Sequence, residues 1–226
     1  MTSKEALRLL DQIIRHRSIL KHPFYLAWQR GELTRNDLAT YATVYYPHVA
    51  AFPDYLRNAI RCAGDPVTKN ELQNNLADEL ANPAPHPELW LDFAEATGAD
   101  RAIVGSSRPT NKTANTILTF DRLTRGDSAS GLAALYAYES QQPAVAAEKI
   151  RGLRSFYAIS GETAVRYFTV HATADIDHRE AERDALERCL ERGGSAENIM
   201  TATNQALDAY WDLLDGVCEE AALAVA

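Results

Sequence analysis

Long apolar runs and clusters of basic residues are both missing from this sequence of 226 residues. No apolar run approaches the roughly 20 residues that a membrane-spanning helix needs, so we expect no membrane partner. Lys and Arg number 23 against 31 Asp and Glu, and the net charge is -8. Because a protein that binds a phosphate backbone normally shows a cationic patch, we expect no nucleic-acid partner either.

Cysteine is also scarce. The three cysteines are Cys62, Cys189 and Cys218, and their wide spacing contains no CxxC-type zinc pattern. An odd number of distant cysteines indicates reduced thiols. The first residues, "MTSKEALRLLDQIIRHR", are charged and amphipathic and do not resemble a secretory signal. We therefore expect a cytoplasmic protein.

Strand signals are weak, since no segment sustains apolar and polar alternation between turn pairs. Helix start and stop signals are frequent instead. They predict helices after Thr2, from Pro23 to Gly31, from Thr34 to about Cys62, after Asp65-Pro66 and over about 87–98, 113–123, 128–157, 162–192 and 196–222. Prolines 47 and 53 predict a kink or break in the third of these. The pattern predicts one all-α domain over residues 1–226, a bundle of seven or more helices.

The stretch "FTVHATADIDHREAERDAL" carries the first candidate site. On one long helix, His171, Asp175 and His178 would fall within about 60° of one another. Imidazole and carboxylate groups on one face suit iron, manganese or zinc. A solvated helix surface explains the same spacing, because Asp177 and Arg179 indicate that the helix is partly exposed.

Other carboxylates and histidines extend this candidate. Glu139 lies in the almost uncharged segment "GLAALYAYESQQPAVAA", where a buried carboxylate needs a cation, a donor or a proton. Glu79 and His86 lie in "NNLADELANPAPHPELW", on either side of a proline-rich turn. Taken singly, each has a simpler interpretation as a helix-terminal charge, a loop residue or a partner of an arginine. Taken together, the six candidates are the ligand supply of a dinuclear non-heme metal site in a helical bundle.

The chain resembles the heme-oxygenase-like helical superfamily that includes PqqC and TenA, and within it the CADD-like proteins (Chlamydia protein associating with death domains). The resemblance covers nearly the whole chain and runs through "HPFYLAWQRGEL", "YYPHVAAFPDYL", "HPELWLDFAEATG", "ALYAYESQ" and "FTVHATADIDH". It implies a heme-oxygenase-like bundle. It also implies two metal ions held, in chain order, by Glu79, His86, Glu139, His171, Asp175 and His178. PqqC, which is cofactor-free, and TenA, which relies on a cysteine nucleophile, fit this residue set less well.

The resemblance further implies a function. CADD-like proteins are implicated in making p-aminobenzoate for folate from a tyrosine of their own chain, with a lysine as the amine source. The matching residues are Tyr25 for the consumed ring, Tyr41 for a second important tyrosine and Lys149 for the amine. We add Tyr138, which directly precedes Glu139, to the candidate catalytic residues. On spacing alone, Lys149 reads as a solvated cation beside Glu148, and most tyrosines read as an aromatic core.

The expected cofactor is a pair of non-heme metal ions, Fe/Fe or Fe/Mn, with O2 and an external reductant as co-substrates. Two alternatives stay open. One is a conventional di-iron oxygenase that turns over a free amino acid or fatty acid many times. The other is a PqqC-like or TenA-like cofactor-biosynthesis or binding protein. The sequence leaves the oligomeric state open, with a homodimer as one option.

Overall fold

The predicted helix start signals act as caps in the computed structural model, which describes residues 2–81 and 83–223. Thr2 and Glu5 form a reciprocal capping box at the first helix, and Thr34 and Asp37 form another at the third. Pro23 begins the second helix, where a missing backbone N–H costs nothing. Gly31 ends that helix in a left-handed conformation (φ 69°) that glycine adopts without strain.

The described residues contain α-helices, one short 3-10 helix and no strand. This confirms the predicted all-α fold. The elements are α1 (Ser3–His16), η1 (Ile19–Lys21), α2 (Pro23–Arg30), α3 (Arg35–Cys62), α4 (Pro66–Ala81), α5 (His86–Thr97), α6 (Arg101–Gly105), α7 (Asn111–Thr124), α8 (Ser128–Glu139), α9 (Gln142–Ser155), α10 (Glu162–His171), α11 (Ala174–Glu191) and α12 (Ala196–Glu220).

The sequence predicted a kink or break at Pro47 and Pro53. No break occurs, because α3 is continuous through both prolines. Its buried face carries Tyr41, Tyr45, Phe52 and other core residues, and it packs against α5 and α7. Tertiary packing along a helix of this length outweighs the hydrogen bond lost at each proline. The short helix α6 was not predicted; Asp100 caps it by accepting hydrogen bonds from the backbone N–H groups of Ala102 and Ile103.

Two helices predicted as continuous are interrupted. The segment predicted as one helix over 128–157 divides into α8 and α9, and Pro143 lies in the first turn of α9 instead of inside a helix. The long helix predicted after Gly161 divides into α10 and α11. At this second break, the Thr173 hydroxyl donates to the backbone carbonyls of Thr169 and Val170 and so competes with the helical ladder.

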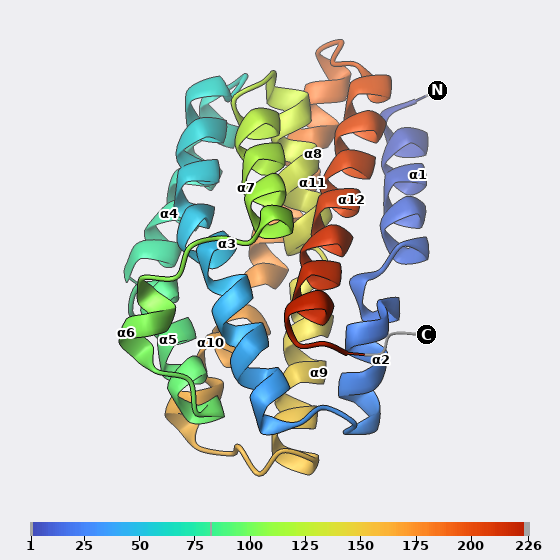
Figure 1. The fold of residues 1–226 in the computed structure, drawn as a ribbon. Helices are drawn as coiled ribbons and strands as arrows, with labels where there is room; N and C mark the ends of the chain where they lie inside the picture. Colours follow the sequence, from blue (N-terminus) through green and yellow to red (C-terminus); the bar gives the residue numbers. More distant parts are fainter. Residues whose placement is uncertain (1, 82, 224–226) are drawn as a thin grey trace.

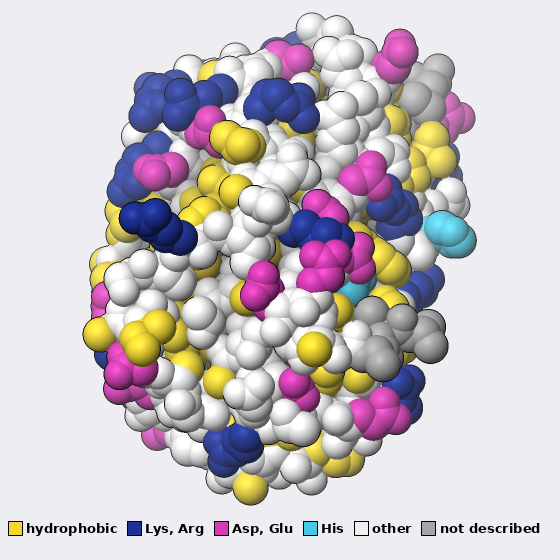
Figure 2. Space-filling view, in the orientation of Figure 1, with side chains coloured by type: hydrophobic (Ala, Val, Ile, Leu, Met, Phe, Trp, Pro, Cys, Tyr) yellow, Lys and Arg dark blue, Asp and Glu magenta, His cyan; other side chains and the backbone are white. Residues whose placement is uncertain are grey.

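The helices pack around one aromatic core. Helix α12 lies against α7 and α8, α3 against α5 and α7, and α10 against α5 and α9 (Figure 1). Charged side chains of both signs are interspersed over the face of the molecule in Figure 2. Within the described residues, no helix combines the length and the apolar character needed to cross a membrane. Each helix break directly follows a buried candidate ligand, Glu139 in the first case and His171 in the second.

Candidate metal centre

Two clusters of buried carboxylates and histidines lie inside the bundle. The first comprises Glu79 from α4, His86 at the start of α5 and His171 at the end of α10. In each cluster, the atoms able to bind a metal all lie within 4.8 Å of one another. The second cluster comprises Glu139 at the end of α8 and Asp175 and His178 from α11. The structure therefore brings all six candidate ligands together from five helices.

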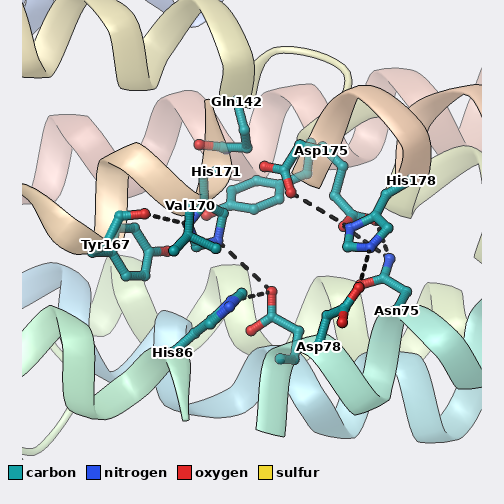
Figure 3. Close-up of polar contacts among 12 residues, drawn as sticks. Asn75, Asp78, His86, Gln142, Tyr167, Val170, His171, Asp175 and His178 are labelled. Atoms are coloured by element: carbon teal, nitrogen blue, oxygen red, sulfur yellow. Dashed lines mark hydrogen bonds and ion pairs between the residues drawn. The ribbon is translucent and has the colours of Figure 1, made fainter. Parts of the chain in front are cut away.

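The first cluster converges on one oxygen of Glu79. Oε1 of Glu79 lies 3.0 Å from Nδ1 of His86 and 3.7 Å from Nε2 of His171 (Figure 3). The other ring nitrogen of His171, Nδ1, is 2.7 Å from the backbone carbonyl oxygen of Tyr167. A proton on Nδ1 donates to that carbonyl and leaves the lone pair of Nε2 facing the cluster. This is the arrangement of a metal-binding histidine held by a backbone acceptor.

In the second cluster, His178 faces two carboxylates. Nδ1 of His178 lies 3.5 Å from Oδ1 of Asp175 and 3.8 Å from Oε1 of Glu139. Its opposite nitrogen, Nε2, lies 3.1 Å from Oδ2 of Asp78, which orients the ring from outside the cluster (Figure 3). The Asn75 amide donates to both oxygens of Glu139, at 2.9 and 3.2 Å. His178 and Glu139 are thus each held by a polar group from outside the candidate ligands.

The prediction that His171, Asp175 and His178 lie on one face of a continuous helix is wrong. His171 ends α10 and Asp175 lies in the first turn of α11. Because of the break at residues 172 and 173, the three residues belong to different clusters. His171 is in the first cluster, and Asp175 and His178 are in the second. The short connection therefore lets one chain segment serve two adjacent metal positions.

The charges of the clusters shift the pKa values of their members. Burial alone would lower the pKa of His171 and His178, but the nearby carboxylates, above all Asp175, raise both to about 9. Burial opposes ionisation of Glu79, yet hydrogen bonds to His171 and His86 lower its pKa to about 2. Burial raises the pKa of Glu139. Two carboxylate and imidazole sets, both removed from water, fit a pair of divalent transition-metal ions.

A small cavity joins the two clusters. It is lined by Glu79 and His171 from the first cluster, by Glu139 and Asp175 from the second, and by Val49, Phe52, Tyr138 and Tyr167. Its volume is about 10 Å³, room for about one water molecule. The ring of Tyr167 stacks on His171 with centroids 4.1 Å apart. Aromatic side chains therefore form the wall that both clusters share.

The candidate catalytic lysine is buried, and its predicted alternative as a solvated cation is wrong. Lys149 is 2% exposed and donates a hydrogen bond to the Tyr41 hydroxyl. Its Nζ lies 4.8 Å from the ring centroid of Tyr41 and 5.7 Å from that of Tyr25. Burial lowers the pKa of Lys149 well below its ordinary value, so the neutral amine is favoured.

Tyrosines connect this lysine with the metal centre. The Tyr138 ring lines the cavity between the clusters, and its hydroxyl lies 3.0 Å from that of Tyr45. The rings of Tyr45 and Tyr41 are 5.3 Å apart, and Tyr41 contacts Lys149. All four candidate catalytic residues are therefore buried along one line of contacts, from the cavity to Tyr25.

Sequence reasoning missed two of the residues that hold the candidate ligands. Asn75 and Asp78 lie one turn and one residue before Glu79 on α4, in "NNLADEL". Their positions follow from the helical repeat once Glu79 is taken as a ligand. No local pattern shows, however, that Asn75 would meet Glu139 from α8, because that contact exists only in the folded bundle.

Comparison with known proteins places these features in a family. A family model described as "Iron-containing redox enzyme" matches residues 39–211. A protein of Nitrosomonas europaea named 4-aminobenzoate synthase is 39% identical over 220 residues, which cover 93% of this chain and 89% of that protein. A protein of Chlamydia muridarum with the same name is 38% identical, covering 97% of this chain and 92% of its own.

Solved structures show the same fold at low sequence identity. A TenA homolog from Pseudomonas syringae superposes with a TM-score of 0.80 at 15% identity and covers 96% of this chain and 93% of its own. A CADD-like protein of unknown function from Nostoc punctiforme superposes with a TM-score of 0.77 at 17% identity and covers 99% of each chain. With the helical bundle, the paired clusters and these relatives, this chain belongs to the iron-containing redox enzymes of the heme-oxygenase-like fold, together with the proteins named 4-aminobenzoate synthase.

Proposed function

We propose that this protein makes 4-aminobenzoate and that the aromatic ring comes from its own Tyr25. The observation that carries the proposal is Lys149, an amine that is buried among tyrosine and tryptophan rings beside Tyr25 and Tyr41. A buried lysine without a charged partner costs stability. No ion pair to Lys149 occurs among residues 2–81 and 83–223, so chemistry is the better explanation for it.

The product named for the relatives has a simple relation to a tyrosine side chain. In 4-aminobenzoate, an amine lies para to a carboxylate on a benzene ring; in tyrosine, a phenol oxygen lies para to the Cβ methylene. The conversion replaces the ring C–O bond with a bond to Nζ of Lys149 and breaks the Cε–Nζ bond of that lysine, with oxidation of Cε to an aldehyde. It also breaks the Cα–Cβ bond of the tyrosine and oxidises Cβ to the carboxylate. The phenol oxygen leaves as water, and O2 is the proposed oxidant.

Lys149 is suited to be the nitrogen donor because its neutral amine keeps a free lone pair on Nζ. Burial, the largest influence, lowers the pKa of Lys149, and a neutral amine is the nucleophilic form. The Tyr41 hydroxyl accepts its hydrogen bond and orients Nζ near the Tyr25 ring. Burial raises the pKa of Tyr25 well above its ordinary value, so this phenol stays protonated until an electron is removed from it.

The proposed cofactor is a pair of non-heme ions, Fe/Fe or Fe/Mn, held by Glu79, His86, Glu139, His171, Asp175 and His178. Bound there, the ions would supply the activation of O2 with electrons from an external reductant. Tyr138 lines the cavity beside both clusters, and Tyr45 and Tyr41 continue from it toward Tyr25. We assign these three phenols the transfer of an electron and a proton away from Tyr25.

The cavity beside the clusters argues against an external organic substrate. Its volume of about 10 Å³ compares with the several hundred Å³ of a typical small-molecule site. O2 fits such a space; a free amino acid or fatty acid does not. A residue such as Tyr25, which is already buried in the core, needs no binding site, which favours the protein's own tyrosine over the conventional oxygenase.

We further propose a cytoplasmic location. Cys62, Cys189 and Cys218 are all free thiols in the structure, as suits a reducing compartment. O2 and a reductant are the proposed reaction partners, and neither nucleic acid nor a membrane takes part. The oligomeric state, including a homodimer, is independent of the site, since all the proposed groups come from one chain.

The proposal is tested by product identification. Iron-loaded protein, with or without manganese, is mixed with O2 and a reductant, and small molecules are analysed by mass spectrometry. We expect 4-aminobenzoate from the wild type and none from Tyr25→Phe or from His171→Ala, although Tyr25→Phe retains its metal. Tyr55→Phe, which removes another buried phenol away from Lys149, is the matched control and should still give product. Product from Tyr25→Phe would contradict the proposal.

A further inference from the structure

A further buried acid lies beside the second cluster. Glu182 follows His178 by one helical turn on α11. Asp175, His178 and Glu182 fall within about 60° of one another on this helix. Glu182 is 3% exposed. The spacing Asp-x-x-His-x-x-x-Glu therefore continues the face of α11 that carries two of the candidate ligands.

Nothing in the described part of the chain neutralises Glu182. Neither of its carboxylate oxygens receives a hydrogen bond. Its closest charged neighbours are the carboxylates of Glu139 and Asp175, which with burial raise the pKa of Glu182 well above its ordinary value. The guanidinium of Arg188, on the same helix, is hydrogen-bonded to Glu71 and Thr68. A buried carboxylate that faces two others costs several kcal/mol unless a cation or a proton compensates it.

A hollow connects Glu182 with the outside of the bundle. Its lining comes from α4, α8 and α11 and includes Thr68, Glu71, Asn75, Leu132, His178 and Glu182. The Glu71 side chain at this hollow is 26% exposed, while Asn75 holds Glu139 of the second cluster. Glu182 therefore lies between the partly exposed end of the hollow and the second cluster.

We propose that Glu182 is a fourth protein ligand of the metal ion held by Glu139, Asp175 and His178. The inference rests on the proposed metal centre. Glu182 lies just outside the group of three ligands and interacts directly with the side chain of Glu139. A divalent cation at the centre of the group attracts all of its carboxylates, and a rotation of the flexible glutamate side chain brings an oxygen onto the ion.

The consequence is an asymmetric pair of sites. The first cluster supplies one carboxylate and two imidazoles, whereas the second, with Glu182, supplies three carboxylates and one imidazole. A dication bound at the second position is thereby more than neutralised by its ligands. Glu182 then contributes to the affinity of one site and leaves the other unchanged.

The test is a metal titration that does not depend on activity. Chelator-treated wild type, Glu182→Gln and Glu180→Gln are titrated with Co²⁺, whose visible absorption reports each binding step. Glu180 is exposed on the same helix and serves as the matched control. We expect Glu182→Gln to weaken one of the two binding steps by about tenfold or more and to leave the other unchanged. Glu180→Gln should match the wild type in both steps.

Thermal unfolding separates ligation from a structural role. Because Glu182→Gln removes a charge from a group of buried carboxylates, the variant should melt at a higher temperature than the wild type when both are metal-free. Its gain in melting temperature with Co²⁺ should be smaller. Unchanged affinity at both steps, or a metal-free variant that melts lower and loses both steps equally, overturns the assignment. A wild type that binds no ion would instead overturn the proposed metal centre itself.

Discussion

At the scale of single residues, burial determines what each candidate group can do. Lys149 and Tyr25 are chemically ordinary side chains, and neither carries a signal in the sequence apart from family resemblance. In the fold both are enclosed by aromatic rings. Loss of water favours the neutral amine and the neutral phenol. The same two residues on a surface would be a cation and an unreactive ring.

The burial of Lys149 predicts that replacing this residue abolishes product formation without lowering stability. Lys149→Met keeps a side chain of similar length and removes a buried amine whose desolvation no ion pair compensates. The variant should therefore be at least as stable as the wild type, and it should make no 4-aminobenzoate. Lys69→Met, at an exposed site, is the control and should change neither property. Thermal unfolding and product analysis check both results.

The same lysine predicts a pH dependence. Its pKa is lowered in the fold, so the unfolded chain binds a proton that the native chain does not, and stability rises with pH toward the ordinary pKa of 10.5. In Lys149→Met this contribution is absent. The difference in unfolding free energy between variant and wild type should therefore shrink as the pH rises. A difference that is constant with pH would show that Lys149 is charged in the fold.

Asp78 gives a prediction for a residue outside the clusters. Its carboxylate holds Nε2 of His178 at 3.1 Å, so that Nδ1 faces Asp175 and Glu139. Asp78→Asn should reduce metal affinity at the second cluster by about 10- to 100-fold, because the ring loses its orienting charge. Asp177→Asn, on the exposed side of α11, is the control. Calorimetric titration that finds equal affinities for the two variants would contradict this role.

At the scale of helices, the sequence predicted starts better than breaks. The capping boxes at Thr2 and Thr34 and the proline at position 23 are local signals, and the helices begin there. The breaks after Glu139 and His171 depend on which partners the following residues meet. Local patterns contain no information on those partners. The breaks nevertheless matter most, since each places a candidate ligand at a helix end.

The same limit explains the partial prediction of the site. Acidic residues and histidines in unusual sequence contexts indicated the six candidate ligands. The family resemblance then implied that these six residues, in chain order, hold two metal ions. Asn75, Asp78 and Glu182 look like ordinary polar residues of amphipathic helices, and only the packing of α4, α8 and α11 shows their contacts. Conversely, spacing alone predicts a solvated cation at Lys149 because this residue lies next to Glu148.

The contact between α2 and α9 predicts the effect of a single added methyl group. A Cβ on Gly152 would lie 2.8 Å from Cδ1 of Trp28, so the two helices would have to separate. Gly152→Ala should cost about 1–3 kcal/mol of stability. Since α2 carries Tyr25 and α9 carries Lys149, product formation should fall as well.

Gly105→Ala is the control for this prediction. A Cβ there would meet only Cδ1 of Leu91 at 3.8 Å, an ordinary contact. Chemical denaturation gives the change in stability, and product analysis of the folded fraction gives the change in activity. A stable and fully active Gly152→Ala would show that the spacing of α2 and α9 is not important for the reaction.

At the scale of the whole molecule, the clusters connect helices that are far apart in the chain. Ligand candidates come from α4, α5, α8, α10 and α11, so bound ions would cross-link most of the bundle. Anything that binds only the folded chain stabilises it by mass action. We therefore expect the metal-loaded protein to melt well above the metal-free protein.

The protonation of the clusters predicts opposite pH trends for these two forms. The pKa values of His171 and His178 are raised to about 9 by neighbouring carboxylates. Their protonation therefore stabilises the metal-free fold fully below pH 6.5, and this stabilisation is lost as the pH rises through 9. Metal ions compete with the same protons, so metal affinity should increase over that range.

Two measurements check these trends. Melting temperatures of metal-free wild type are compared, from pH 6 to 9.5, with those of the double variant His171→Gln, His178→Gln, which lacks the titrating rings. The wild type should lose its advantage over the variant as the pH rises. Metal titration of the wild type should show tighter binding over the same range. Metal affinity that does not vary with pH would exclude ligation by these histidines.

The most direct test follows the ring carbon atoms of the protein. Protein is expressed with ring-¹³C tyrosine, loaded with iron or with iron and manganese, and reacted with O2 and a reductant in unlabelled buffer. We predict labelled 4-aminobenzoate at no more than one molecule per chain and a fall in intact protein mass. Peptide mapping should locate one change in "HPFYLAWQR" at Tyr25 and a second at Lys149. Unlabelled product, or several product molecules per chain, would contradict a sacrificed tyrosine and indicate an external substrate.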